Sequence, residues 1–239
     1  MLAILLTSLR PMRSSAIKLS QNTGYHSPTL CSAPITFFYN DVYDVQLPDN
    51  HKFPMHKYRY VRESLQREYA ESPFVHFQVS PLATREELIS THCPHYVQRF
   101  ISGDMNISEN RRVGFPWSLA GVQRSTSSVG GTVEAMRSVL MSFGEPNSPR
   151  ASGHIAGGTH HAFFDHGEGF CVFSDIAVAA NLAITEYQKV VKKILIVDLD
   201  VHQGNGNAAL FSSSDNVFTF SMHCKENLFS AKQSSDVDV

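Results

Sequence analysis

The sequence has few cysteines, little net charge and no long hydrophobic run. Its four cysteines lie far apart in 239 residues and form no CxxC pair, which gives no disulfide or zinc-finger framework and favours a reducing compartment. The net charge of −2 argues against direct nucleic-acid binding, although an enzyme acting on a basic protein tail would tolerate it. Since no run reaches transmembrane length, we expect a globular protein without a membrane partner.

Acidic residues are absent from the first 40 positions, which hold six serines and the basic residues Arg10, Arg13 and Lys18. This composition is typical of a mitochondrial or plastid transit peptide, and a disordered tail is the alternative. We therefore predict a tail or transit peptide over residues 1–34 and a single domain over residues 35–239.

Predicted strands and helices alternate along the chain after this tail. Apart from Lys192 and Lys193, residues 191–197 are apolar with almost no alternation, which is typical of a strand buried on both faces of a parallel sheet. Further strands are expected at 33–40 and 216–223, and helices at 56–69, on both sides of Pro94, at 114–143 and from about Asn207. The pattern predicts an α/β fold with a three-layer parallel sheet flanked by helices.

Capping residues and a pair of glycines predict where helices begin and where one packs closely. Thr84, followed by two acids, and Ser174 are predicted to begin helices. The pair Gly130 and Gly131 inside the predicted helix 114–143 would cost about 1 kcal/mol each against alanine, so it indicates close packing against another backbone.

Polar residues follow the apolar strand in IVDLDVHQGNG, residues 196–206. Ligand sites in parallel sheets lie beyond the carboxyl ends of strands, and Asp198, Asp200 and His202 would share one side of an extended chain. Carboxylates and an imidazole suit a divalent metal such as zinc. A solvated strand end is the alternative interpretation.

A histidine pair, His160 and His161, follows another predicted strand in GGTHHAF. Such a pair alone is more often structural, but the carboxyl ends of parallel strands share one edge of a sheet. Together the two segments indicate metal-assisted hydrolysis, in which the metal polarises a carbonyl and an imidazole moves protons.

The motifs GGTHHAF, HGEGFCVF, DIAVAA and DLDVHQGNG, in this order, resemble those of the zinc-dependent histone deacetylases. The residues within these motifs are most similar to class IV. DVYDVQLPDNHKFPMHKYR, VQRFISG and RRVGFPWS look like the same subfamily. The resemblance covers about residue 37 to the end. It implies an arginase/deacetylase-like fold, hydrolysis of acyl-lysine amides on a protein such as a histone tail, and a nuclear or cytoplasmic location.

The resemblance also implies roles for the two polar segments. Asp200 and His202 match two zinc ligands, and His160 matches a histidine that pairs with a buried aspartate and supports the attacking water. His161 matches the general base and acid. Its partner is Asn205 where many relatives have aspartate, and a neutral amide stabilises an imidazolium less than a carboxylate does.

Two further sites are implied by the resemblance alone. Gly169 and Phe170 match the wall of the acyl-lysine tunnel, where an aromatic ring can pack on a lysine stem. Asp198 and Ser221, with carbonyls near Asp200, His202 and Met222, match a structural monovalent-cation site such as one for K⁺.

The end of the sequence departs from the family pattern. The family's third zinc ligand and its transition-state tyrosine match segments beyond the final SSDVDV, while Asp236 and Asp238 match a stretch before a surface loop. The resemblance thus implies a domain truncated at its C-terminus, inactive or nearly so unless a partner chain completes the fold.

Two other functions stay open. One is a fragment or isoform without catalysis that binds or regulates. The other is a phosphatase that uses Asp198 and Asp200 as nucleophile and acid, because ILIVDLDV resembles the DxD strand of haloacid-dehalogenase-type enzymes.

Overall fold

The computed structural model describes residues 3–7, 33–226 and 230–239. The strands are β1 (Ala3–Thr7), β2 (Ile35–Tyr39), β3 (Val75–Val79), β4 (Ser152–His154), β5 (Lys193–Asp198), β6 (Val217–Ser221) and β7 (Val237–Asp238). The helices are α1 (Lys57–Glu68), α2 (Arg85–Ile89), α3 (Pro94–Ser102), α4 (Ile107–Val113), α5 (Leu119–Leu140), α6 (Asp175–Glu186) and α7 (Asn205–Phe211).

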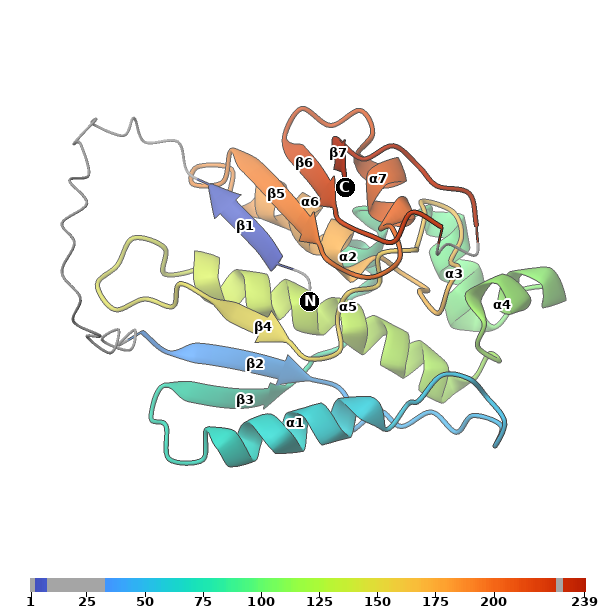
Figure 1. The fold of residues 1–239 in the computed structure, drawn as a ribbon, viewed down its shortest axis with the longest axis horizontal. Helices are drawn as coiled ribbons and strands as arrows, with labels where there is room; N and C mark the ends of the chain where they lie inside the picture. Colours follow the sequence, from blue (N-terminus) through green and yellow to red (C-terminus); the bar gives the residue numbers. More distant parts are fainter. Residues whose placement is uncertain (1–2, 8–32, 227–229) are drawn as a thin grey trace.

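The strands form two sheets, in the orders β1-β5-β6-β7 and β3-β2-β4 (Figure 1). β5, β6 and β7 run parallel, as do all three strands of the second sheet, whereas β1 pairs antiparallel with β5. The predicted α/β class with parallel strands is confirmed, with two hydrogen-bonded sheets among the described residues in place of the single sheet expected.

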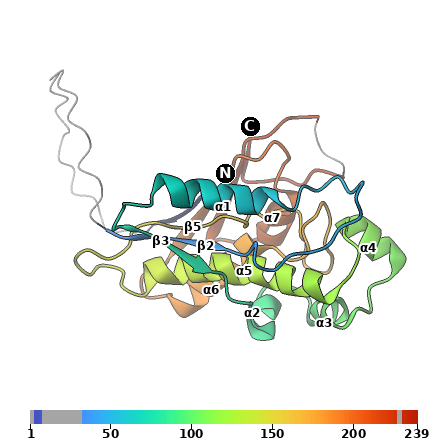
Figure 2. The same ribbon diagram turned by 90° about the horizontal axis from the view of Figure 1, so that it is seen from below.

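Helices cover both faces of the strands. Figure 2 shows α1 on one side and α5 and α6 on the other, with β2 and β3 between them. The apolar core is built largely on the side of α5 and α6, where Ile176, Val178 and Val129 are fully buried. Packing in this core holds in place the loops that follow the strands on the side of α5 and α6. No helix in the described ranges is long and apolar enough to cross a bilayer.

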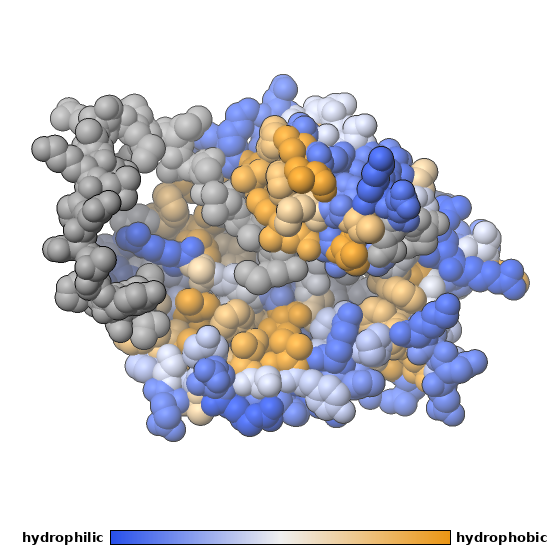
Figure 3. Space-filling view, viewed as in Figure 1, coloured by the Kyte–Doolittle hydropathy of each residue, from blue (hydrophilic) through white to orange (hydrophobic). Residues whose placement is uncertain are grey.

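Apolar side chains also gather on the surface over β5 and β6 in Figure 3. Exposed apolar residues on these strands, or directly after them, are Leu199, Val201, Phe218 and Met222. Contiguous apolar surface of this kind usually marks an area that another segment or chain covers.

The paired glycines of α5 pack as predicted. A Cβ on Gly130 would lie 2.9 Å from the Ala83 amide nitrogen and would collide with the Pro81 carbonyl, and one on Gly131 would meet the His154 ring. These contacts let α5 approach the loop after β3 and strand β4.

Helix α5 begins later than predicted. It starts at Leu119, because Ser118 has an extended backbone and its hydroxyl accepts a hydrogen bond from the Gly121 amide. Residues 114–118 are therefore a loop. The helix starts at Thr84 and Ser174 are confirmed, since both side chains cap the following helix.

The predicted tail or transit peptide over residues 1–34 stays a prediction. Residues 1–2 and 8–32 of the predicted tail or transit peptide lie outside the described residues, so that prediction stands untested there. Within residues 1–34, β1 pairs antiparallel with β5, a pairing that local sequence patterns do not predict.

Candidate active site

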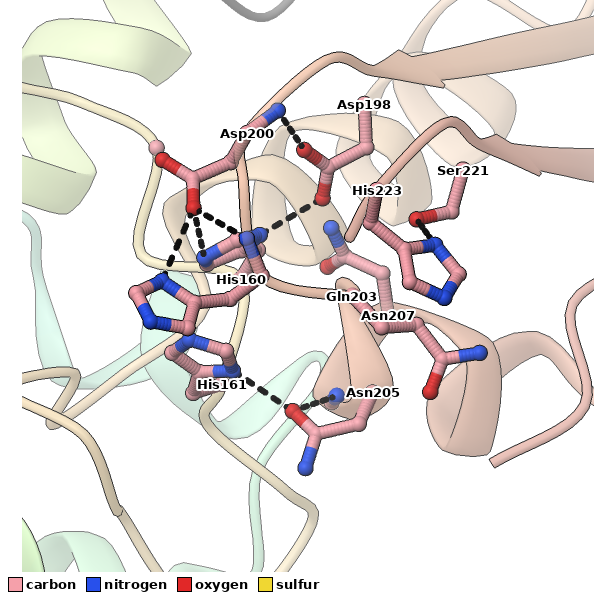
Figure 4. A network of polar contacts seen from close by, with 12 residues as sticks. His160, His161, Asp198, Asp200, Gln203, Asn205, Asn207, Ser221 and His223 are labelled. Carbon is pink, nitrogen blue, oxygen red and sulfur yellow. Dashed lines mark hydrogen bonds and ion pairs between the residues drawn. The ribbon is translucent and has the colours of Figure 1, made fainter. Parts of the chain in front are cut away.

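The two polar segments meet at the carboxyl ends of β5 and β6 (Figure 4). Asp198 is the last residue of β5, and His160 and His161 lie in the loop after β4. The rings of the two histidines are 4.0 Å apart between centroids. The predicted meeting of the two segments at one edge is therefore observed.

His160 is held by Asp198. Its Nδ1 lies 2.6 Å from Asp198 Oδ2, and both residues are buried. The other carboxylate oxygen accepts a hydrogen bond from the Asp200 amide at 3.0 Å. A Cβ at position 204 would collide with Asp198 Oδ2, so Gly204 is needed for the close approach of this turn.

His161 is held by Asn205. Its Nδ1 lies 2.6 Å from Asn205 Oδ1, which also accepts the Gly206 amide at 3.0 Å. Burial, and then the neighbouring charge of His160, lower the pKa of His161 to about 4, against a smaller opposing effect of the Asn205 hydrogen bond. His161 is therefore neutral near pH 7 and able to accept a proton.

Asp200 and His202 are more open to solvent, with side chains 48% and 33% exposed. Asp200 Oδ1 lies 3.1 Å from His202 Nδ1 and 3.9 Å from His160 Nε2. Partial burial raises the pKa of Asp200, but the His202 amide and the charges of His160 and His202 outweigh it and lower the pKa below its usual value. Asp200 is thus ionised, as a metal ligand must be.

The backbone after β5 is not extended, and that part of the prediction was wrong. The amides of Asp200 and His202 each donate to the carboxylate two residues earlier, which bends the chain. Their side chains converge through this bend and not through strand alternation.

The zinc prediction fits the donor chemistry of Asp200 and His202. Their facing atoms, Asp200 Oδ1 and His202 Nδ1, lie 3.1 Å apart and are hydrogen-bonded to each other in this structure. Within the described residues, however, no group of three His, Cys, Asp or Glu side chains could hold a metal. A catalytic zinc takes about three protein ligands, so Asp200 and His202 alone are fewer than such a site needs.

Asp236 and Asp238 do not supply the missing donor in this structure. Asp236 accepts hydrogen bonds from the amide and hydroxyl of Thr219, and Asp238 accepts one from the Gln203 side chain at 2.8 Å. The expectation that neither aspartate is a zinc ligand stays a prediction.

The predicted tunnel wall lies in an aromatic cluster. Gly169 and Phe170 both have positive φ, at 57° and 65°, a conformation that is uncommon for phenylalanine. The Phe170 ring packs on Phe53 and Phe115 at centroid separations of 5.1 Å each, and the three rings line a small cavity of about 40 Å³. An aromatic surface for an alkyl chain is therefore present.

The predicted monovalent-cation residues are neighbours. Asp198 pairs with Ser221 across the parallel strands, and the Asp198 carbonyl accepts the Met222 amide at 3.0 Å. The Ser221 hydroxyl lies 3.0 Å from His223 Nδ1. Cation binding here stays a prediction.

Sequence reasoning missed Glu168. This buried acid of the HGEGF loop accepts a hydrogen bond from Asn205 Nδ2 at 2.8 Å. An acid between two glycines, directly before the predicted wall residues, was the available signal.

The family model described as "Histone deacetylase domain" matches residues 51–237. The chain belongs to the histone deacetylase family. An uncharacterized protein of Picosynechococcus sp. is 39% identical over 201 residues, which are 84% of this chain and 64% of that protein. The histone deacetylase-like amidohydrolase of Pseudomonas aeruginosa is 31% identical over 148 residues, covering 60% of this chain and 36% of that protein.

The histone deacetylase fold is also seen in a solved structure. The crystal structure of the HDA15 HD domain superposes with a TM-score of 0.64 and 18% identity, over 80% of this chain and 53% of that one. The chain thus spans less than two thirds of the length of these relatives.

Family membership and burial argue against the phosphatase hypothesis. Asp198 is 4% exposed, and its oxygens accept from His160 and Asp200. Because both carboxylate oxygens already have hydrogen-bond partners within the protein, Asp198 fits a supporting role better than that of a nucleophile.

Proposed function

We propose that the domain represented by this chain is a zinc-dependent lysine deacylase. The observation that carries the proposal is the pair of buried histidines, each oriented by a separate side chain, beside Asp200 and His202. The substrate is the acylated lysine of a protein such as a histone tail.

Asp200 and His202 would hold the zinc, which when bound polarises the amide carbonyl and lowers the pKa of water. His160, fixed by Asp198, positions the attacking water by hydrogen bonding. His161 takes a proton as the water oxygen bonds to the carbonyl carbon. It then protonates the lysine nitrogen as the C–N bond breaks, leaving a free lysine and a carboxylate.

The cluster around Phe170 would bind the aliphatic lysine stem. Its rings offer apolar area on which methylene groups pack, while the charged or amide end reaches the histidines. Asp198 and Ser221 would also bind a K⁺-like cation beneath the site.

We assign the chain to class IV and propose that its deacetylase domain continues beyond these residues. Support comes from the class IV-like motifs, the small number of proposed zinc ligands among the described residues, the 64% coverage of the Picosynechococcus relative and the apolar surface over β5 and β6. A partner chain that covers this surface would complete the domain in the same way as further residues of this chain. The location proposed is the nucleus or cytoplasm, or an organelle if residues 1–34 act as a transit peptide.

The test compares this chain with an extended form, defined as the chain continued with the rest of a histone deacetylase domain. The extended form should hydrolyse acetyl-lysine or long-chain acyl-lysine peptides in a zinc-dependent manner. A fragment without catalysis is the second candidate, favoured by the incomplete ligand set. It would be supported if neither form turned over any acyl-lysine peptide.

A further inference from the structure

We infer that Glu168 is a positioning residue for the proposed deacylation, on which this inference rests. Its carboxylate fixes the orientation of the Asn205 amide, and the amide in turn fixes the proton of His161 on Nδ1. Three side chains, Glu168, Asn205 and His161, thus join the loop that carries Gly169 and Phe170 to the imidazole proposed as general base.

The three side chains form continuous short hydrogen bonds. Asn205 Nδ2 lies 2.8 Å from Glu168 Oε1, and Asn205 Oδ1 lies 2.6 Å from His161 Nδ1. The residues are 8%, 0% and 3% exposed, in the order Glu168, Asn205 and His161. Water therefore competes little for these bonds.

An asparagine alone cannot fix the proton of a histidine. Its amide presents an acceptor on one side and a donor on the other, and the two ends can exchange by rotation. With the oxygen toward His161, Nδ1 must donate; with the nitrogen toward it, Nδ1 must accept and the proton moves to Nε2. The second arrangement would remove the acceptor nitrogen that the base needs.

Glu168 removes this ambiguity. An ionised carboxylate only accepts hydrogen bonds, so the amide must turn its NH₂ to Glu168 and its oxygen to His161. The Gly206 amide, 3.0 Å from Asn205 Oδ1, favours the same orientation. In relatives with aspartate in place of Asn205, the carboxylate would do this directly.

Glu168 is itself held in place. The Ser230 hydroxyl donates to the same Oε1 at 2.6 Å, which helps to offset the cost of burying the carboxylate. Glu168 directly precedes Gly169 and Phe170, so a purely structural role in shaping the wall is the competing explanation. The experiment must separate the two roles.

The first experiment is a double-mutant cycle in the extended form. Glu168→Gln should lower kcat about 10-fold with little change in KM, the lower end of the usual loss for groups that orient a catalytic residue. In the background of Asn205→Asp the same change should raise kcat. In that background a carboxylate at position 205 already faces His161, and the negative charge of Glu168 would only repel this second carboxylate. Equal losses in both backgrounds, or a loss confined to KM, would overturn the positioning role.

The second experiment needs no activity and uses the 239-residue chain. Nitrogen NMR of the His161 ring should show the proton on Nδ1 in the parent and a mixture of tautomers in Glu168→Gln. Asp165→Asn, which changes an exposed acid of the same loop, should retain the parental tautomer. An unchanged tautomer in Glu168→Gln would refute the inference. Absence of acyl-lysine turnover in a folded extended form with the parental tautomer would instead count against the proposed function alone.

Discussion

The two histidines differ in their partners, and this difference supports the separate roles proposed for them. His160 meets a carboxylate, Asp198, whereas His161 meets a neutral amide, Asn205. An imidazolium is better stabilised beside a carboxylate, and burial lowers the pKa of His161 to about 4. His161 therefore stays neutral near pH 7 and returns an acquired proton readily.

His161→Ala should lower kcat of the extended form by about 10²-fold or more, the usual contribution of a general acid–base group. His166→Ala is the control, because His166 lies in the same loop and pairs with the exposed Asp165. Single-turnover assays of both variants make the comparison. A His161→Ala variant that keeps most of the parental rate would remove His161 from the mechanism.

Asp198→Asn should slow catalysis more than it weakens zinc binding. Asp198 contacts His160 and the Asp200 amide but lies behind the proposed ligand atoms. Parallel measurement of kcat and of zinc affinity by competition with a chelator tests the ranking. Asp200→Asn is the matched control and should show the opposite ranking; a larger effect of Asp198→Asn on affinity would make Asp198 a ligand.

At the scale of elements, the sequence predicted the features that depend on local chemistry. The cap at Ser174, the packing of Gly130 and the contact between His161 and Asn205 all follow from residue types at short spacing or from family motifs. β3 and α4 were missed although signals existed, namely the alternation in VHFQV and the capping box of Asn106 and Glu109. The pairing of β1 with β5 and the hydrogen bond from Asn205 to Glu168 depend on distant segments, which local patterns do not specify.

Gly130→Ala should destabilise the chain by about 1–3 kcal/mol, the usual cost of overpacking. The added methyl group would collide with the Pro81 carbonyl and lie 2.9 Å from the Ala83 amide nitrogen. The shift in Tm should be about 2–4 °C per kcal/mol for a chain of this size. Leu119→Ala, at an exposed position of the same helix, should change Tm little. Equal Tm values for Gly130→Ala and the parent would show that α5 does not pack this closely.

At the scale of the whole molecule, a buried histidine links stability to pH. His92 is fully buried, and burial lowers its pKa to about 4 despite opposing hydrogen bonds from the backbone of Phe163 and Phe164. Its Nε2 accepts the Ser174 amide at 2.9 Å, a bond that protonation would break. In the unfolded chain its pKa is near 6.5, so below that pH the unfolded state binds the extra proton.

The free energy of unfolding should therefore fall as the pH drops from about 6.5 to 4, with a contribution from His92 of up to ~1.4 kcal/mol per pH unit. Denaturant titrations across this range measure the slope. His92→Gln should reduce the slope, and His95→Gln, at an exposed position, should leave it unchanged. An unaltered slope in His92→Gln would show that His92 does not titrate with unfolding.

The incomplete ligand set makes a further prediction about the 239-residue chain. It should bind zinc weakly and turn over acyl-lysine peptides at least about 10²-fold more slowly than the extended form, the usual cost of losing one oxyanion donor. Zinc content after purification and matched peptide assays test this. Near-stoichiometric zinc with turnover equal to that of the extended form would point to a ligand outside the pair Asp200 and His202, or to one from a second chain.

Zinc-dependent release of an acyl group from an acyl-lysine peptide by the extended form tests the central claim most directly. The account predicts turnover that a chelator abolishes, that added zinc restores, and that Asp200→Asn and His161→Ala each reduce by about 10²-fold or more. Turnover that persists after complete removal of zinc, or in both variants, would contradict it.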